Sequence, residues 1–390
     1  MRFDEIKSPC FILDYETLFK NVTAFKTALC KKNPRNILGY SLKTNSLPQM
    51  LVILKQLGCY AEVVSYTEYE LALLEGFDKT HIIYNGPLKS KETFLDAIKN
   101  GAIVNIETKR ELDWLAYLDP NKNYGVGIRV NLDLGSISPT DAKKEEASSR
   151  FGFSFENGEL ESAINSICSY KNITINGLHL HRTSLTRSLK VYRNICHYAG
   201  SIISKLNLRL GYIDIGGGYF GDKPNTPTYA EYIHVIYESL KPYIDVANVQ
   251  LIVEPGNAIA ASPFSFVSEV IDTKIIGNIR FVVTDGSRND IDPFFQKKDY
   301  FKKIIRLSDK RKKCNLQTIV GCSCLEYDKL FSIVNEPEIE IGDKIVYYNV
   351  GAYTMTLSPL FIRFFPKVYL LTPLGYEEIR QEWKADNLLQ

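Results

Sequence analysis

The chain has 390 residues, of which 45% are hydrophobic and 24% charged, so it can fill the core of one or two globular domains. Its formal net charge of +2 indicates neither a nucleic acid nor an anionic membrane as partner. We see no secretory leader after Met1, no apolar run long enough to span a membrane, and no small disulfide framework among the eight cysteines. We therefore expect a cytoplasmic protein with reduced thiols.

Strand-like and helical segments alternate through the first two thirds of the chain. Residues 8–15 predict a strand, and the spacing of Leu18, Val22, Phe25 and Leu29 predicts a helix after it. Eight further apolar runs follow, at 37–43, 61–65, 81–85, 102–107, 125–131, 175–181, 212–217 and 251–256, and helical segments separate most of them. This alternation predicts parallel strands with helical crossovers. Eight such units predict an α/β fold with a TIM-like (β/α)8 barrel.

The chain changes character after about residue 260. Runs at 265–276, 279–285, 316–320 and 344–348 are rich in Val, Ile and aromatic residues, and most have no helix between them. They predict a β-rich C-terminal domain, a β-barrel or sandwich, which the strand at 8–15 joins. The barrel is then expected to span 25–262, and the β-rich domain 1–24 with 263–390. The polar stretch 136–150 is expected to be a surface excursion.

Lys43 follows the apolar run Ile37–Leu42 at the end of the first barrel strand. Taken alone, such a lysine most often reaches solvent. Barrel enzymes, however, carry their chemistry at the carboxyl ends of the strands, where a lysine amine suits Schiff-base chemistry. Both interpretations stay open on this stretch.

Other strand ends also carry polar residues, among them Asn85 and Arg129. The run Gly216–Gly218 follows the seventh strand, where barrels often bind phosphate, although such a run can also be a flexible turn. Glu254 ends the eighth strand, either as a solvated acid or as the partner of a protonated ring nitrogen.

The sixth strand carries His179 and His181, which alternate and so face the same side. His181 lies nearer the strand end and is the better candidate to lie against a flat cofactor ring. We predict no metal site, because no third ligand has metal-like spacing.

Nine segments together resemble the fold-type III pyridoxal-phosphate decarboxylases, the family of diaminopimelate decarboxylase and eukaryotic-type ornithine decarboxylase. The resemblance covers nearly the whole chain and rests on the order of the segments. They are SLKTN at 41–45, AEVVSYTE at 61–68, SRFGF at 149–153, HLHRTS at 179–184, DIGGGY at 214–219, EPG at 254–256, DGSRNDIDP at 285–293, GCSCLEYD at 321–328 and NVGAY at 349–353.

The resemblance implies pyridoxal 5'-phosphate as cofactor. Lys43 resembles the lysine that forms the aldimine, His181 the histidine stacked on the ring, and Glu254 the acid at the ring nitrogen. Glu62 and Glu68 resemble acids that support the lysine and the histidine. The remaining cofactor contacts that it implies come from Ser184, Gly216, Gly217, Gly218, Gly256 and Tyr353.

Cys324 resembles the cysteine that acts on the substrate carbon, and it completes the predicted catalytic pair with Lys43. In the family this segment reaches into the neighbouring subunit's site. The resemblance therefore implies a homodimer with shared active sites.

Several positions depart from diaminopimelate decarboxylases. Asn257 and Asp292 stand where those enzymes have arginine, Leu325 stands where they have glutamate, and Arg182-Thr183 precedes Ser184 where they have glycine. These losses disfavour free meso-diaminopimelate. Asp292 and Asp328 are candidates to bind an amine instead, so the predicted substrate contacts are Asp292, Asp328, Leu325 and Asn257.

The predicted activity is α-decarboxylation through an external aldimine and a quinonoid, with Cys324 or Lys43 returning a proton to Cα. We expect an amino acid or amino-acid conjugate, possibly carrier-linked, of a specialised or natural-product pathway, with diaminopimelate or another basic amino acid as the alternative. An amino-acid racemase and a non-catalytic pyridoxal-phosphate-binding protein are further alternatives. Glu254 argues against the racemase, and the presence of Lys43 and Cys324 argues against the non-catalytic protein.

Overall fold

The computed structural model describes residues 3, 6–142, 149–221 and 225–389. The chain forms two compact units: unit 1 contains Met1–Lys20 and Ala260–Gln390, and unit 2 contains Asn21–Ile259. The domain bounds expected from the sequence differ from these units by a few residues. Part of the expected excursion at 136–150, residues 143–148, lies outside the described residues. No helix within the described ranges is long and apolar enough to cross a membrane.

Unit 2 is built on a closed barrel of parallel strands, in which β2 pairs with β9 to complete the ring. This confirms the predicted (β/α)8 barrel. The strands are β2 (Ile37–Ser41), β3 (Tyr60–Ser65), β4 (Ile82–Leu88), β5 (Ile103–Ile106), β6 (Tyr124–Arg129), β7 (Ile173–His179), β8 (Tyr212–Asp214) and β9 (Gln250–Val253).

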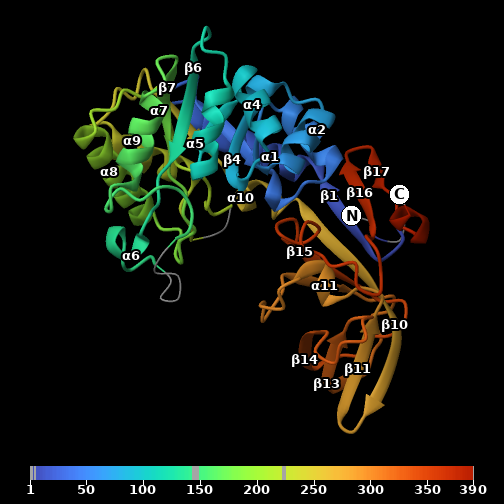
Figure 1. The fold of residues 1–390 in the computed structure, drawn as a ribbon. Helices are drawn as coiled ribbons and strands as arrows, with labels where there is room; N and C mark the ends of the chain where they lie inside the picture. The colour runs from blue at the N-terminus through green and yellow to red at the C-terminus, as the bar shows by residue number, and fades with distance from the viewer. Residues whose placement is uncertain (1–2, 4–5, 143–148, 222–224, 390) are drawn as a thin grey trace. The chain divides into compact units, whose positions relative to one another are not determined.

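Helices follow the barrel strands and surround them (Figure 1). Ser65, Ser90, Ser188 and Thr228 each begin a helix by accepting a hydrogen bond from a backbone N–H in the first turn. The helices are α1 (Tyr15–Cys30), α2 (Pro48–Gln56), α3 (Tyr66–Leu74), α4 (Lys91–Lys99), α5 (Lys109–Trp114), α6 (Leu134–Ile137), α7 (Glu159–Cys168), α8 (Leu189–Lys205), α9 (Tyr229–Leu240) and α10 (Asn257–Ala260), with 3-10 turns at Leu42–Thr44, Lys79–His81 and Leu115–Tyr117.

Tyr212, at the start of β8, packs in a buried cluster with Ile37, Ile83 and Ile252 from other barrel strands. A side chain at Gly127 on β6 or Gly177 on β7 would overlap the tyrosine ring, so these two glycines make room for it. The Tyr212 hydroxyl donates to Asn105 Oδ1 on β5 at 2.7 Å. Because the barrel strands run parallel, the polar residues at their carboxyl ends gather at one end of the barrel.

Unit 1 is a mixed β-sheet with strand order β14-β13-β11-β10-β1-β16-β17, and β15 pairs with β10 and β12. Its strands are β1 (Cys10–Asp14), β10 (Phe264–Ile276), β11 (Ile279–Thr284), β12 (Lys302–Ile305), β13 (Lys313–Val320), β14 (Lys329–Pro337), β15 (Lys344–Tyr348), β16 (Lys367–Thr372) and β17 (Gly375–Arg380), with α11 (Arg288–Ile291) and a 3-10 turn at Ala385–Leu388. β10 and β11 form a long hairpin with β13 and β14 beside it (Figure 1). β1 pairs with β10 and β16, which confirms that the N-terminal strand belongs to this domain.

Candidate active site

Residues from most of the barrel strands line one cavity of about 330 Å³ in unit 2. Lys43, His181 and Glu254, the three residues predicted to hold a cofactor ring, are in its wall. The wall also contains Glu62, Val64, Asn85, Gly86, Pro87, Arg129, Phe151, His179, Arg182 and Thr183. The barrel thus brings together side chains that are more than 200 residues apart in the sequence.

Lys43 lies in the 3-10 turn Leu42–Thr44, directly after β2, so the strand ends two residues earlier than predicted. Its Nζ is 2.9 Å from Glu62 Oε2, and the side chains are 36% and 1% exposed, respectively. The buried carboxylate holds the amine at the cavity wall, while the amine itself stays accessible. This is the role expected for Glu62.

Asn85, in the middle of β4, connects the two acids of the cavity. Its Nδ2 donates to Glu62 Oε1 at 3.1 Å and to Glu254 Oε1 at 2.6 Å. Its Oδ1 accepts from Asn105 Nδ2 at 2.8 Å. The sequence placed Asn85 at a strand end but assigned it no role; the barrel makes it the bridge between the lysine's partner and the ring-nitrogen acid.

Glu254 belongs to a buried group with His179 and Asp214, each of which offers an atom within 4.8 Å of the others. Burial acts to raise the pKa of Glu254, but His179, Asp214 and Lys43 outweigh it and hold that pKa well below its usual range. Burial, together with the neighbouring Glu254, raises the pKa of Asp214 well above its ordinary value. Asp214 therefore keeps a proton and Glu254 is ionised, so the pair carries one negative charge.

The same three residues are possible metal ligands that spacing in the sequence did not suggest. Because Asp214 keeps its proton beside the ionised Glu254, the two acids carry one negative charge, which suits a single ring N–H. The group therefore fits a ring N–H that faces an ionised carboxylate.

His181 lies two residues beyond the end of β7 at His179, so it is not in the strand as the sequence had indicated. Its Nδ1 accepts from the Gly217 backbone N–H at 3.2 Å, and its ring lies within 5° of parallel to that of His179. Burial, with Arg129 and Lys43 nearby, lowers the pKa of His181 to about 3. The ring is therefore neutral, which suits stacking against an aromatic cofactor.

The glycine run Gly216–Gly218 forms a tight turn after β8. Gly216 N donates to Asp214 Oδ1 at 2.8 Å, and Gly216 and Gly218 have φ values of 68° and 94°. A side chain at Gly216 would overlap His181, and one at Gly217 would overlap the Glu254 carbonyl oxygen. The turn therefore requires glycine and keeps its backbone open to close approach, as a phosphate cradle needs.

The other predicted contacts in unit 2 lie near these elements. Ser184 is in the loop between β7 and α8, where its Oγ accepts from Arg187 N at 3.0 Å. Gly256 is buried against Thr44, and a side chain there would overlap the threonine hydroxyl. Glu68 accepts from Val64 N at 2.8 Å at the start of α3, and its support of the histidine stays a prediction. Burial raises the pKa of Glu68 to about 7.

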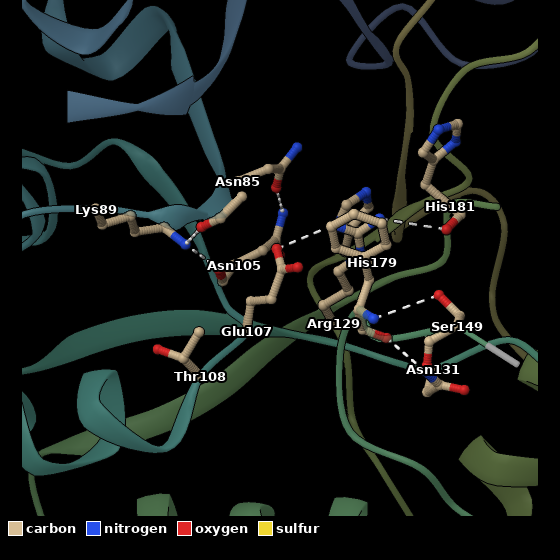
Figure 2. A network of polar contacts seen from close by, with 12 residues as sticks. Asn85, Lys89, Asn105, Glu107, Thr108, Arg129, Asn131, Ser149, His179 and His181 are labelled. Carbon is tan, nitrogen blue, oxygen red and sulfur yellow. Dashed lines mark hydrogen bonds and ion pairs between the residues drawn. The ribbon is translucent and has the colours of Figure 1, made fainter. Parts of the chain in front are cut away.

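Arg129 is a cavity residue that the sequence placed at a strand end without a role. Its Nη1 is 2.9 Å from Glu107 Oε2, and its guanidinium lies 4.6 Å from the centre of the Phe151 ring. Figure 2 shows Arg129 between Glu107 and His181, whose carbonyl oxygen accepts from Nη2 at 3.4 Å. The available signal in the sequence was an acid, Glu107, directly after β5 and a basic residue, Arg129, at the end of the next strand, but only the barrel shows that the two pair.

Cys324, Leu325 and Tyr353 belong to unit 1. Cys324 is exposed, Leu325 is half-buried, and Tyr353 is 41% exposed with φ at 55°. Asn257 begins α10 directly after Gly256 and is half-buried. The roles assigned to these four residues stay predictions.

Asp292 and Asp328, the candidates to bind an amine, are buried in unit 1 with their carboxylates already bonded. Asp328 accepts from Arg288 N at 2.8 Å and from the Ser287 and Ser323 hydroxyls at 3.0 and 2.5 Å. Asp292 accepts from Arg288 Nε at 2.9 Å and from the backbone N–H groups of Gln296 and Lys297. These contacts give both acids a structural role, and their contribution to substrate binding stays a prediction.

The residues of the cavity fit pyridoxal phosphate. Within the described residues, His179 Nδ1 is buried without a hydrogen-bond partner, and His179 Nε2 lies 3.5 Å from Oε2 of the ionised Glu254. The cavity also presents an accessible amine at Lys43 and a neutral imidazole at His181, which accepts from Gly217 N of the glycine turn. An aldehyde, an aromatic ring with a basic nitrogen and a phosphate would each meet a matching group.

Comparison with known proteins supports the same assignment. Residues 16–261 match the family described as pyridoxal-dependent decarboxylase, pyridoxal binding domain. A probable chloroplastic diaminopimelate decarboxylase from Oryza sativa is 29% identical over 363 residues, covering 90% of this chain and 72% of the relative. Diaminopimelate decarboxylase from Aquifex aeolicus is 25% identical, with coverage of 90% and 83%, and antizyme inhibitor 2 from Xenopus laevis is 27% identical, with coverage of 99% and 84%.

Solved structures share the fold over both units. Diaminopimelate decarboxylase from M. jannaschii aligns with a TM-score of 0.84 at 22% identity, covering 99% of this chain and 92% of that one. The Helicobacter pylori enzyme in complex with L-lysine aligns with a TM-score of 0.82 at 24% identity, with coverage of 99% and 97%. The chain therefore belongs to the family of pyridoxal-dependent decarboxylases, and it is a pyridoxal-phosphate enzyme similar to diaminopimelate decarboxylase.

Proposed function

We propose that the protein removes the α-carboxylate of diaminopimelate or a similar basic amino acid, with pyridoxal phosphate held in the cavity of unit 2. One observation carries the proposal: Lys43, paired with Glu62, shares a single cavity with ionised Glu254 and neutral His181. A general surface lysine would have no reason to be surrounded by these groups.

Each part of the cofactor would contact a different residue of the cavity or of the loops beside it. Lys43 would bind its aldehyde carbon, His181 would lie against its ring, and Glu254 would keep its ring nitrogen protonated. Gly216–Gly218 and Ser184 would hold its phosphate. When bound, pyridoxal phosphate withdraws electrons from the substrate Cα as the carboxylate leaves.

Proton transfer falls to the chain's own residues. Lys43 Nζ, held by Glu62 at 2.9 Å, or Cys324 Sγ returns a proton to Cα after the carboxylate has left. The bridge from Glu62 through Asn85 to Glu254 keeps the lysine's partner and the ring-nitrogen acid in fixed register. A homodimer in which Cys324 and Tyr353 complete the partner's site, and a cytoplasmic location, are parts of this proposal.

The choice of substrate rests on the relatives. Several relatives are named diaminopimelate decarboxylase, and one related structure is a complex with L-lysine, the decarboxylated form of diaminopimelate. This favours a free basic amino acid over a conjugated or carrier-linked one. Asn257, Asp292 and Leu325 still differ from the pattern of those enzymes, so the distal end of the substrate is the part that needs testing.

The first test is Lys43→Ala in the full-length protein. Purified protein incubated with pyridoxal phosphate should show the long-wavelength absorbance of lysine-bound cofactor, and the variant should lose it. Lys43→Arg keeps the positive charge opposite Glu62 but should lose the same absorbance, which separates covalent attachment from charge. An unchanged spectrum in either variant would contradict the assignment.

The second test identifies the reaction. The protein should release carbon dioxide from meso-diaminopimelate, lysine, ornithine or arginine at measurably different rates, and chiral chromatography should find no racemised substrate. Racemisation without carbon dioxide would favour the racemase. Release only from amino acids conjugated or carrier-linked through the side chain, with the α-amine and α-carboxylate free, would favour the specialised pathway.

A further inference from the structure

Asp141 joins the segment after β6 to the loop between β7 and α8. It is 3% exposed, and its Oδ1 accepts hydrogen bonds from the hydroxyls of Thr186 and of Ser188, the latter at 2.8 Å. Its Oδ2 accepts from Ser138 Oγ at 2.6 Å, and its backbone carbonyl accepts from Leu185 N at 2.8 Å. One buried carboxylate thus holds hydroxyls from two segments that are over 40 residues apart in the sequence.

The carboxylate is held in its charged form. Burial acts to raise the pKa of Asp141, but the hydroxyls of Ser138, Thr186 and Ser188 donate to the ionised form and lower that pKa below its usual range. Hydrogen bonds to a charged group are stronger than those between neutral groups. The connection therefore resists opening at neutral pH.

The loop on the other side of Asp141 carries the phosphate serine of the proposed site. His181 and Thr183 line the cavity, Ser184 follows them, and Asp141 holds the next residues. Ser184 Oγ accepts from Arg187 N at 3.0 Å, which leaves its hydroxyl proton to donate to a phosphate oxygen. Arg187 has φ at 52°, in the left-handed region, so the turn that presents Ser184 needs support from outside.

That support is provided from two directions. Tyr232 donates its hydroxyl to the Arg187 carbonyl at 2.6 Å from α9, and Ser188, which Asp141 holds, is the N-cap of α8. On the far side, Asn194 on α8 donates to Ser138 Oγ and to the Ile137 carbonyl, both at 3.1 Å. Asp141 is the one charged group in these contacts, and it bonds the loop directly.

We propose that Asp141 is a positioning residue for phosphate: by holding Leu185, Thr186 and Ser188 it fixes the loop that presents Ser184 to the phosphate of the cofactor. This rests on the proposed function, because it takes Ser184 to be a phosphate contact. If the loop is already ordered in the apoprotein, binding does not have to order it. The loss of conformational entropy on binding is then smaller, and the affinity for the phosphate group is higher.

The experiment compares two ligands that differ only in the phosphate. The dissociation constants of pyridoxal phosphate and of pyridoxal are measured by absorbance and fluorescence titration of apoprotein, for wild type and for Asp141→Ala. We expect the constant for pyridoxal phosphate to rise about tenfold, the order of one hydrogen bond to a charged group. The constant for pyridoxal should change less than about twofold, since that ligand makes no phosphate contact.

Two further variants keep the test decisive. Thr186→Val removes one loop hydroxyl and leaves the bond from Ser138 to Asp141, so it should weaken pyridoxal phosphate selectively even if Asp141→Ala fails to fold. Asp133→Ala is the matched control, because the Asp133 carboxylate accepts, among the described residues, from Gly135 N at 2.9 Å and Ser136 Oγ at 2.6 Å within its own segment. Asp133→Ala should leave both constants unchanged.

Equal weakening of both ligands in Asp141→Ala and Thr186→Val would overturn the proposal, because it would reduce Asp141 to general support of the barrel. Unchanged affinity for pyridoxal phosphate in both variants would overturn it as well. A wild-type protein that binds neither ligand would instead contradict the proposed function, and this inference with it.

Discussion

Lys89 and Glu111 form an ion pair whose side chains are both 0% exposed, at 3.2 Å between Nζ and Oε2. Lys89 Nζ also donates to the carbonyl oxygens of Gly86 at 2.7 Å and Asn105 at 3.1 Å (Figure 2). Glu111 accepts in addition from Glu107 N and from the Thr108 hydroxyl, both at 2.9 Å. The pair therefore ties the end of β4, next to Asn85, to the end of β5.

We expect Glu111→Gln to lower the free energy of unfolding by about 3–5 kcal/mol, because it leaves the Lys89 charge buried with only two carbonyls to balance it. Lys89→Met should cost a similar amount, since it strands the Glu111 charge and removes the donor from both carbonyls. The double variant buries no charge. Its cost should fall below the sum of the two single costs by at least about 1 kcal/mol.

The chain has two tryptophans, one in each unit. The unfolding of the barrel can therefore be monitored separately by tryptophan fluorescence. Trp114 ends α5, the helix that carries Glu111, whereas Trp383 packs on Phe365 in unit 1. In a Trp383→Phe background, Trp114 fluorescence during urea unfolding reports the stability of unit 2. Single costs under about 1 kcal/mol, or costs that simply add, would refute the buried ion pair.

Two further predictions concern the cofactor cavity. The pKa of His181 is lowered to about 3 in the folded protein. Between about pH 6.5 and 3 the unfolded chain therefore binds a proton at this residue and the folded chain does not. As a result, His181 lowers the free energy of unfolding as the pH decreases through this range. His181→Phe should therefore lose less stability than wild type between pH 7 and pH 5 in urea unfolding, and equal losses would contradict the neutral imidazole. Gly217→Ala should destabilise unit 2 by about 1–3 kcal/mol, because its Cβ would overlap the Glu254 carbonyl. Gly221→Ala should not destabilise unit 2, because the added Cβ would lie at an ordinary van der Waals distance of 3.6 Å from the nearest atom. Equal effects of the two substitutions would argue against a tightly packed turn at Gly217.

Much of this protein could be predicted from the sequence because the relevant patterns are local. Strand and helix periodicity extends over five to fifteen residues, so the eight strands and the change of character near residue 260 could be located without a structure. Once eight parallel strands are predicted, barrel closure alone requires Lys43 and Glu254 to meet at one face. The order of the motifs then pointed to the cofactor, and the family match agrees with it.

The local details near strand ends were less accurate. Lys43 lies in a 3-10 turn and His181 beyond β7, although both were placed in strands. Hydrophobicity does not change where a parallel strand leaves the barrel, so the pattern continues past the last paired residue. Pairing, not composition, decides where such a strand ends.

Only the tertiary structure decided which polar groups bond to one another. Asn85 meets Glu254 across 169 residues, and Thr186 meets Asp141 across 45. Asp292 and Asp328, which their position in the sequence presented as substrate contacts, have their carboxylates bonded within unit 1. A carboxylate has the same sequence signature whether it binds a ligand or a neighbouring segment. The strand register and the loop geometry determine its partners, because hydrogen bonds require contact within about 3 Å.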